Sequence, residues 1–180
     1  MAVSILQKDE PVLRQKALPV GDDMFGTPKL RKILRDMSVA LASQDDGVAI
    51  AAPQIGVSLR IFVISKRVLE LLYPDRPETQ GSKAKDMVFI NPRITKLSRE
   101  RAVVEEGCLS VRYLYGETLR AKKARVRAYD ENGSEFEIGG SGLIAQIFQH
   151  EIDHLDGVLF IDHAQNVRDM PPSSDTTTHD

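Results

Sequence analysis

The residues with the clearest chemical potential are two histidines and a glutamate in the stretch His150-Glu151-Ile152-Asp153-His154. Residues four apart in an α-helix lie on one face, about 5–6 Å apart at Cβ, so two imidazoles at this spacing can bind one metal ion. A glutamate directly after the first histidine can reach a water on that metal without being a ligand. The pattern therefore predicts a metal site for hydrolysis, provided that the segment is helical.

The residues around this stretch support a helix. Apolar residues recur at helical spacing and on more than one side, at Leu143, Ile144, Ile147, Phe148 and Leu155. Ser141 or Gly140 can cap the start of the helix, and Gly157 stands where helices commonly end. Because the apolar residues do not form a single stripe, we expect a buried central helix. Buried histidines need partners for their polar atoms, and a metal ion provides one.

A catalytic site of this kind usually has a third protein ligand, for which the sequence offers three candidates. In the extended motif with a third histidine, Phe160 stands at the ligand position, and no glutamate follows Glu151. Asp162 and His163 lie just beyond the predicted helix. Cys108 is the only cysteine, and the glycine before it permits close approach of the backbone. The spacing alone does not choose among these three residues.

Three blocks of sequence resemble the signatures of the peptide deformylase family. They are Gly47–Gln54 (GVAIAAPQ), Glu106–Ser110 (EGCLS) and His150–His154 (HEIDH). The blocks occur in the order typical of the family, and the resemblance covers roughly residues 5–163. Three ordered blocks are far more specific than the histidine motif alone.

The resemblance implies one divalent metal ion per chain, bound by Cys108, His150 and His154. A thiolate with two imidazoles suits Fe(II), Zn(II), Ni(II) or Co(II), and the ligand types do not choose among these ions. The resemblance favours Fe(II) in the cell. The fold that it implies is α+β, with mixed or antiparallel sheets around a central helix that carries the metal ligands.

The reaction implied by the resemblance is removal of the formyl group from the N-terminal formyl-methionine of newly made polypeptides, with release of formate. Glu151 would transfer the proton, and the Gln54 amide and the Leu109 backbone N–H would stabilise the oxyanion. The residues implied to line the substrate site are Gly47, Val48, Ala49, Val104, Glu106, Gly107, Leu143, Ile147 and His150.

Three positions near the implied site depart from the family pattern. Ala49 stands where a second glycine is usual, and it would be strained if its backbone needed φ > 0. Arg112 and Tyr113 stand where a proline and a small residue are common. We therefore expect an altered preference for the residues after methionine, with a mild bias towards acidic side chains through Arg112.

Two other functions stay open on the sequence alone. One is another zinc peptidase with the same histidine motif, against which the Cys108 block argues. The other is a structural zinc module, or a non-catalytic relative that only binds. Structural zinc sites are usually closed by four protein ligands, whereas Glu151 beside three ligands favours an open catalytic site.

Composition and charge exclude several classes of protein. The chain has 180 residues, of which 42% are hydrophobic and 28% charged, as in one globular domain. A net charge of −2 gives no general attraction to nucleic acid or anionic membranes. One cysteine excludes a disulfide framework and suits a reducing compartment. Lys8, Asp9 and Glu10 interrupt the apolar start, so we expect no signal peptide, no membrane span and a cytoplasmic protein.

The remaining pattern predicts one catalytic domain over residues 1–163, with residues 66–87 as an inserted loop around a short helix. Thr27-Pro28 predicts the start of another helix. Strands are expected at residues 60–64, 87–90, 93–97, 101–104, 124–130 and 135–138. Residues 164–180 are expected to be a disordered tail that peptide turnover does not need.

The expected partners are formyl-methionyl peptides, without nucleic-acid specificity. The basic run between Arg120 and Arg127 predicts a solvated strand face, because no aromatic residues are interleaved to stack on bases. The tail contains a single Lys or Arg, Arg168, so transient contact with the ribosome is not expected to use it.

Overall fold

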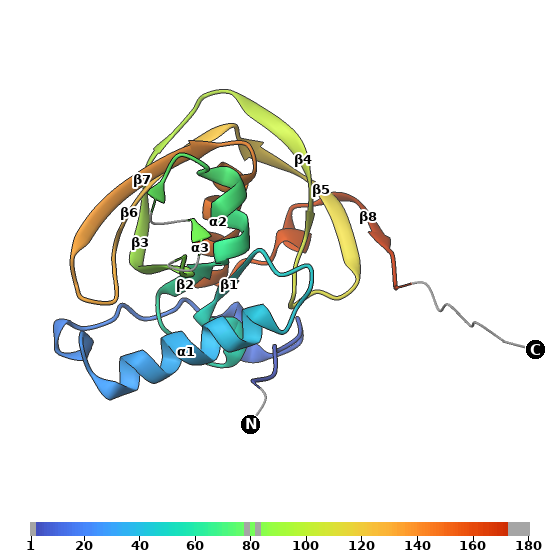
Figure 1. The fold of residues 1–180 in the computed structure, drawn as a ribbon. Coiled ribbons are helices and arrows are strands. Elements are labelled where there is room, and N and C mark those ends of the chain that lie inside the picture. The colour runs from blue at the N-terminus through green and yellow to red at the C-terminus, as the bar shows by residue number, and fades with distance from the viewer. Residues whose placement is uncertain (1–2, 78–79, 82–83, 173–180) are drawn as a thin grey trace, which may run out of the picture.

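The computed structural model describes residues 3–77, 80–81 and 84–172, and Figure 1 shows their arrangement. Two sheets, one of five strands and one of three, surround a central helix, α3 (Leu143–Leu155). A second helix, α1 (Pro28–Ala42), runs along one flank of the molecule. The predicted α+β fold, with sheets around the helix that carries the histidine motif, is therefore confirmed.

Both sheets are antiparallel throughout. The five-stranded sheet has the order β1-β2-β3-β6-β7, with β1 (Ala49–Ala51), β2 (Ile61–Ile64), β3 (Met87–Leu97), β6 (Lys123–Tyr129) and β7 (Glu135–Ser141). The three-stranded sheet has the order β4-β5-β8, with β4 (Arg101–Gly107), β5 (Leu114–Ala121) and β8 (Gln165–Asp169). The two sheets place the end of β4 beside α3, where the sequence predicts the third ligand.

The main core lies between α3 and the five-stranded sheet. Phe148 on α3 packs against Phe62 of β2 and Phe89 of β3, with ring centroids 6.4 Å and 5.6 Å away. The helix also contacts β5 of the other sheet. Because sheets cover it on more than one side, most of α3 is buried, which confirms the prediction of a buried central helix.

The start of α3 differs from the sequence expectation, whereas its end agrees with it. The cap is Gly142 (φ 59°) rather than Ser141 or Gly140, because pairing with β6 keeps β7 extended as far as Ser141. Gly157 follows the helix as predicted, with φ 77°. A Cβ there would lie 2.7 Å from the carbonyl oxygen of Arg14, so both the backbone conformation and the space require glycine.

Helix α1 supports the segment that contains Gln54. The helix begins as predicted, because Thr27 Oγ1 accepts a hydrogen bond of 3.2 Å from the Leu30 N–H. Its buried side, which includes Met37, packs against β1 and against the 3-10 helix Ala52–Ile55. This packing holds the first sequence block in place beside the site.

Strands β3 and β5 are among those that differ from the sequence expectations. The separate strands expected at 87–90 and 93–97 are one strand, β3, which continues through an irregularity at Asn91 (φ 50°). The sequence pattern does not predict β5, because polar residues such as Thr118 and Arg120 occupy its buried positions. Hydrophobic alternation is the main strand signal, and β5 lacks it.

The expectation of a disordered tail is wrong for residues 165–169. They form β8, which pairs antiparallel with β5. All of these residues are exposed, so backbone hydrogen bonds hold the strand and no hydrophobic pattern marks it in the sequence. Truncation at Ala164 would remove this edge strand and is therefore not expected to be neutral. Residues 173–180 lie outside the described residues.

The segment expected to be an inserted loop contains the predicted short helix, α2 (Lys66–Leu72). Leu69 of this helix is 2% exposed and belongs to the main core, so the segment is anchored at this point. Residues 78–79 and 82–83 of the expected loop lie outside the described residues.

The assignment of residues 1–163 to one catalytic domain, and of residues 66–87 to an insertion, stays a prediction.

Among the residues that the structure describes, no helix is both long enough and apolar enough to cross a bilayer.

Candidate active site

Cys108, His150 and His154 bring their potential metal-ligand atoms within 4.8 Å of one another. Among the described residues, no other group of three or more His, Cys, Asp or Glu side chains converges in this way. Cys108 follows the end of β4, and its Sγ lies 3.2 Å from Nε2 of His154 on α3. The other two candidates for the third ligand lie elsewhere. Asp162 forms an ion pair with Arg14, and His163 is outside the cluster.

The donor set and its surroundings fit a bound divalent metal ion. A thiolate and two imidazoles converge, as in transition-metal sites. The Nδ1 atom of His150 faces Glu106, which leaves Nε2 as its free donor. In the described part of the chain, Oε2 of Glu151 is buried without a hydrogen-bond partner, and this residue lines the same cavity as Cys108 and His150. A buried polar atom of this kind indicates that the protein alone does not complete the site.

A buried network of ionic side chains contacts the Nδ1 atom of His150. Glu106 Oε1 lies 2.5 Å from His150 Nδ1, and Arg120 contacts both Glu106 oxygens, at 2.6 Å and 3.0 Å. Arg120 also contacts Asp153 Oδ2 at 2.6 Å. Only 8% of the Arg120 side chain is exposed. The prediction that the basic run is a solvated face is therefore wrong at Arg120, which turns inward because two carboxylates neutralise its charge.

This network keeps the Glu106 carboxylate ionised. Burial by itself would raise the pKa of Glu106, but hydrogen bonds from His150 and Arg120 hold the pKa well below its usual range. Thr118 Oγ1 donates a further hydrogen bond of 2.5 Å to the same carboxylate. An ionised Glu106 fixes the orientation and tautomer of the His150 ring, which is the usual role of a carboxylate behind a metal-binding histidine.

Glu151 is a buried carboxyl group at the cavity wall. Burial raises the pKa of Glu151 to about 7; the nearby His150 charge opposes this shift, and the Glu106 charge adds to it. Since a general acid–base group works best with a pKa near the working pH, this carboxyl is suited to both accept and release a proton.

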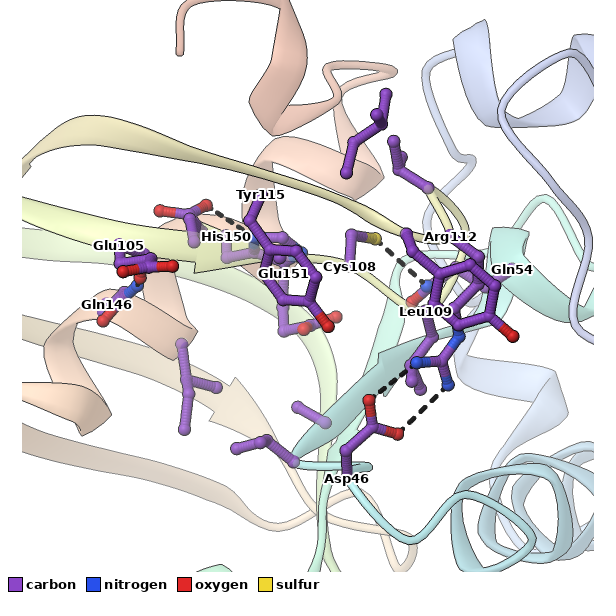
Figure 2. A pocket seen from close by; sticks show the side chains of 18 of the residues that line it. Asp46, Gln54, Glu105, Cys108, Leu109, Arg112, Tyr115, Gln146, His150 and Glu151 are labelled. Carbon is purple, nitrogen blue, oxygen red and sulfur yellow. Dashed lines mark hydrogen bonds and ion pairs between the residues drawn. The ribbon is translucent and has the colours of Figure 1, made fainter. Parts of the chain in front are cut away.

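The orientation of the Gln54 side chain is fixed at both ends. Its Oε1 accepts a hydrogen bond of 2.8 Å from the Ala51 N–H, and its Nε2 donates one of 3.0 Å to Ser110 Oγ. Nε2 therefore points towards Cys108, whose Sγ is 3.7 Å away, as Figure 2 shows. Ser110 belongs to the second sequence block, and its contact with Gln54 is not evident from the sequence pattern.

A cavity of about 320 Å³ brings the predicted residues together. Those that line it are Val48, Ala49, Gln54, Glu106, Gly107, Cys108, Leu109, Leu143, Ile147, His150 and Glu151. Gly47 and Val104, also predicted to bind substrate, are not among the lining residues. Gly47 packs against α1 instead. The approach is so close that a Cβ on this glycine would lie 2.8 Å from the carbonyl oxygen of Leu41.

Several lining residues carry no signal that sequence reasoning used. They are Asp46, Glu105, Val111, Leu114, Tyr115 and Gln146. Tyr115 lies in β5, and its ring covers Gly107 so closely that a Cβ on that glycine would be 2.6 Å from a ring carbon. This contact gives Gly107 a packing reason to be glycine, in line with the close approach expected there.

The structure corrects two expectations about the altered positions. Ala49 lies in β1, paired with Ile64, and is not among the residues with positive φ, so it carries no such strain. Arg112 does not present a free positive charge, because its guanidinium contacts Asp46 at 2.6 Å and 3.1 Å and Gln44 Oε1 at 2.7 Å. The expected bias towards acidic substrates through Arg112 therefore lacks its physical basis.

Comparisons with known proteins agree with this geometry. A family model described as Polypeptide deformylase matches residues 2–170. Peptide deformylase 2 of Clostridium acetobutylicum is 41% identical over 160 residues, which cover 87% of this chain and 91% of that protein. The peptide deformylase of Thermomicrobium roseum is 38% identical over 181 residues, which cover 98% of this chain and 96% of that protein.

Solved structures also match nearly the whole chain. A peptide deformylase from Legionella pneumophila has a TM-score of 0.76 at 37% identity, with 92% of this chain and 88% of that chain covered. The Met-Ala-Ser-bound class I type b peptide deformylase from Acinetobacter baumannii has a TM-score of 0.76 at 30% identity, with 91% and 99% covered.

Proposed function

Because this chain belongs to the polypeptide deformylase family, we propose that Glu151, Gln54 and Leu109 divide the work of the family's reaction among them. That reaction is hydrolysis of the N-formyl group of nascent polypeptides. One observation carries the assignment: the cavity is lined by two members of the three-ligand cluster, Cys108 and His150, together with a buried carboxyl group and a fixed amide.

Cys108, His150 and His154 would hold one divalent metal ion. Such an ion, when bound, acts as a Lewis acid and makes water a better nucleophile near neutral pH. Three protein ligands are typical of catalytic rather than structural sites. We assign Fe(II) to the site in the cell, although Zn(II), Ni(II) or Co(II) suit the same donors.

Glu151 is the proton-transfer residue in this mechanism. Burial favours the protonated form of this carboxyl group, so its carboxylate can take a proton from the attacking water and pass it to the nitrogen that leaves. Its buried position beside His150 keeps bulk water from competing for that proton. No other carboxyl group that lines the cavity combines burial with a free oxygen among the described residues, since Glu106 is engaged by His150 and Arg120.

Two donors would stabilise the oxyanion that forms as water adds to the formyl carbon. Gln54 Nε2 is held towards the cluster by the contacts of Gln54 with Ala51 and Ser110. The backbone N–H of Leu109, next to Cys108 in the chain, is the second donor. Donors that are fixed before the reaction cost no reorganisation when charge develops, and one such donor is typically worth about 10²–10³ in rate.

The methionine side chain would occupy the apolar part of the cavity. Val48, Leu143 and Ile147 line this part, and they come from the first sequence block and from the first two turns of α3. Such a wall suits an unbranched apolar side chain, which buries its surface against these residues.

The test of this function is formate release from formyl-Met peptides. We expect protein that is purified anaerobically and loaded with iron to release formate and to lose activity in air, because the iron oxidises and the thiolate can follow. The nickel-loaded protein should keep its activity longer. Equal lifetimes of the two forms in air would contradict the iron assignment, whereas no formate from either form would contradict the function.

Replacing Cys108 by alanine should abolish stoichiometric metal binding, because it removes the thiolate from a three-ligand site. The measurement is the metal content per chain after anaerobic purification. His163→Ala is the matched control, since this histidine lies outside the cluster and should keep its metal. Full occupancy in Cys108→Ala would overturn the ligand assignment.

Two alternative functions predict other products from peptide substrates. A zinc peptidase would cleave internal bonds of unformylated peptides, and a binding protein would retain formyl peptides without releasing formate.

We also assign the protein to the cytoplasm, where a reducing environment protects a thiolate ligand. Contact with the ribosome would not use β8, because its one basic side chain, Arg168, pairs with Glu105 at 2.5 Å.

A further inference from the structure

One wall of the cavity is joined to the other by an ion pair between residues far apart in the sequence. Arg112 Nη1 lies 2.6 Å from Asp46 Oδ2, and Arg112 Nη2 lies 3.1 Å from Asp46 Oδ1. Nη2 also donates to Gln44 Oε1 at 2.7 Å. Figure 2 shows the two parallel contacts between the guanidinium and the carboxylate. Paired contacts of this kind are stronger and better defined than a single surface ion pair.

The two partners belong to the two segments that would flank a bound peptide. Asp46 directly precedes the first sequence block, whose Val48 lines the cavity. Arg112 follows the Cys108 block, whose Leu109 provides the proposed oxyanion donor. Asp46 is the more exposed partner, with 57% of its side chain accessible against 22% for Arg112. The pair, here called the rim pair, therefore stands where the cavity meets solvent.

The rim pair is ionised at neutral pH. A hydrogen bond from Arg112 lowers the pKa of Asp46, and the same contact raises the pKa of Arg112. The other charged residue at the edge of the cavity, Glu105, is also paired, with Arg168. Glu105 lies on the other side of the cavity from the rim pair (Figure 2), so these charges around the cavity cancel in pairs.

A peptide bound by its formyl-methionine must pass close to these charges. The formyl group has to reach Cys108 and Gln54, and the cavity has a volume of only about 320 Å³. The peptide residues that follow methionine therefore have to leave the cavity at its edge. Two or three extended residues span roughly 7–10 Å. That is about one Debye length at physiological ionic strength, so an unpaired charge on the rim would act on their side chains.

We propose that the rim pair sets the enzyme's preference for the residues after methionine by neutralising a cation and an anion that would each select for the opposite charge. Intact, the pair makes the enzyme treat acidic and basic residues nearly alike. Either partner alone would bias the site, Arg112 towards acidic peptides and Asp46 towards basic ones. The proposal rests on the deformylase function and concerns the specificity of that same site.

The two single variants have predictions of opposite sign. Asp46→Asn leaves Arg112 unpaired and should raise the ratio of kcat/KM for formyl-Met-Asp-Asp over formyl-Met-Lys-Lys by about threefold to tenfold, as expected for one partly exposed charge interaction. Arg112→Gln leaves Asp46 unpaired and should lower the same ratio by a similar factor. The double variant should return the ratio to near the wild-type value.

The ratio is a better measure than either rate alone. Both peptides are assayed on one preparation, so partial unfolding or metal loss lowers both rates and cancels in the ratio. The shifts should fall mainly on KM and should shrink as salt is raised, because the rim is exposed to solvent. Glu137→Gln is the matched control, since it breaks an exposed ion pair with Arg127 that does not line the cavity.

The outcomes separate this proposal from the function on which it rests. The proposal would be overturned if both single variants kept the wild-type ratio of kcat/KM for the acidic over the basic peptide, or if both variants shifted this ratio in the same direction. The rim pair would then be a purely structural contact. Absence of formate from all peptides with metal-loaded wild-type protein would instead contradict the function. In that case, calorimetric binding of Met-Asp-Asp and Met-Lys-Lys to the same variants still tests the rim pair, because unpaired charges should shift the two affinities in the same opposite directions.

Discussion

Glutamine in place of Glu151 is expected to lower the rate of formate release by about 10²–10⁴-fold and to leave the metal in place. The loss is the typical contribution of general acid–base catalysis. The amide has nearly the shape of the carboxyl group but cannot take up a proton. Because Glu151 is outside the group of three ligands, metal binding should survive the substitution. The measurements are kcat with formyl-Met peptides and metal content per chain.

A matched control for this prediction is Glu100→Gln. Glu100 is largely exposed and does not line the cavity, and within the described part of the chain its side chain makes one ion pair, a long contact of 3.8 Å with Lys122. Its kcat should equal that of the wild type. Turnover near the wild-type rate in metal-replete Glu151→Gln would remove this residue from the mechanism.

The sequence predicts the local part of the site well. The spacing of His150 and His154 on a helix is a local property, and apolar residues around them indicate burial directly. The third ligand is different, because Cys108 lies 46 positions from His154 in the chain. Its role follows from resemblance to a family and not from spacing, which leaves Asp162 and His163 equally open.

The parts that sequence reasoning misses depend on pairing between distant segments. Charged residues in a strand are normally predicted to be exposed, so the burial of Arg120 cannot be inferred without knowing that Glu106 and Asp153 lie beside it. The same holds for Arg112, whose charge is interpreted as free until Asp46 is seen next to it. Strand β8 is missed because its exposed side chains leave no periodic pattern.

Removal of the buried guanidinium by Arg120→Met should be the most destabilising of the changes considered. It leaves the Glu106 carboxylate buried with only His150 and Thr118 as partners, and breaking a buried ion pair from one side typically costs about 3–5 kcal/mol. Metal affinity should also fall, by about 10–100-fold, because Glu106 no longer holds the His150 ring in place as firmly. Denaturant unfolding of the metal-free protein gives the stability, and competition with a chelator gives the metal affinity.

Two further variants separate the stability effect from the effect on the metal. Arg125→Met removes an exposed partner of Glu137 and should cost less than about 1 kcal/mol, as is usual for surface ion pairs. Adding Glu106→Gln to Arg120→Met removes the stranded charge and should recover part of the stability. It should not recover metal affinity, because a neutral amide is a weaker partner for His150 Nδ1 than a carboxylate. If Arg120→Met unfolds at the same denaturant concentration as the wild type, the network is not a buried ionic support for His150, and the metal site is held by its three ligands alone.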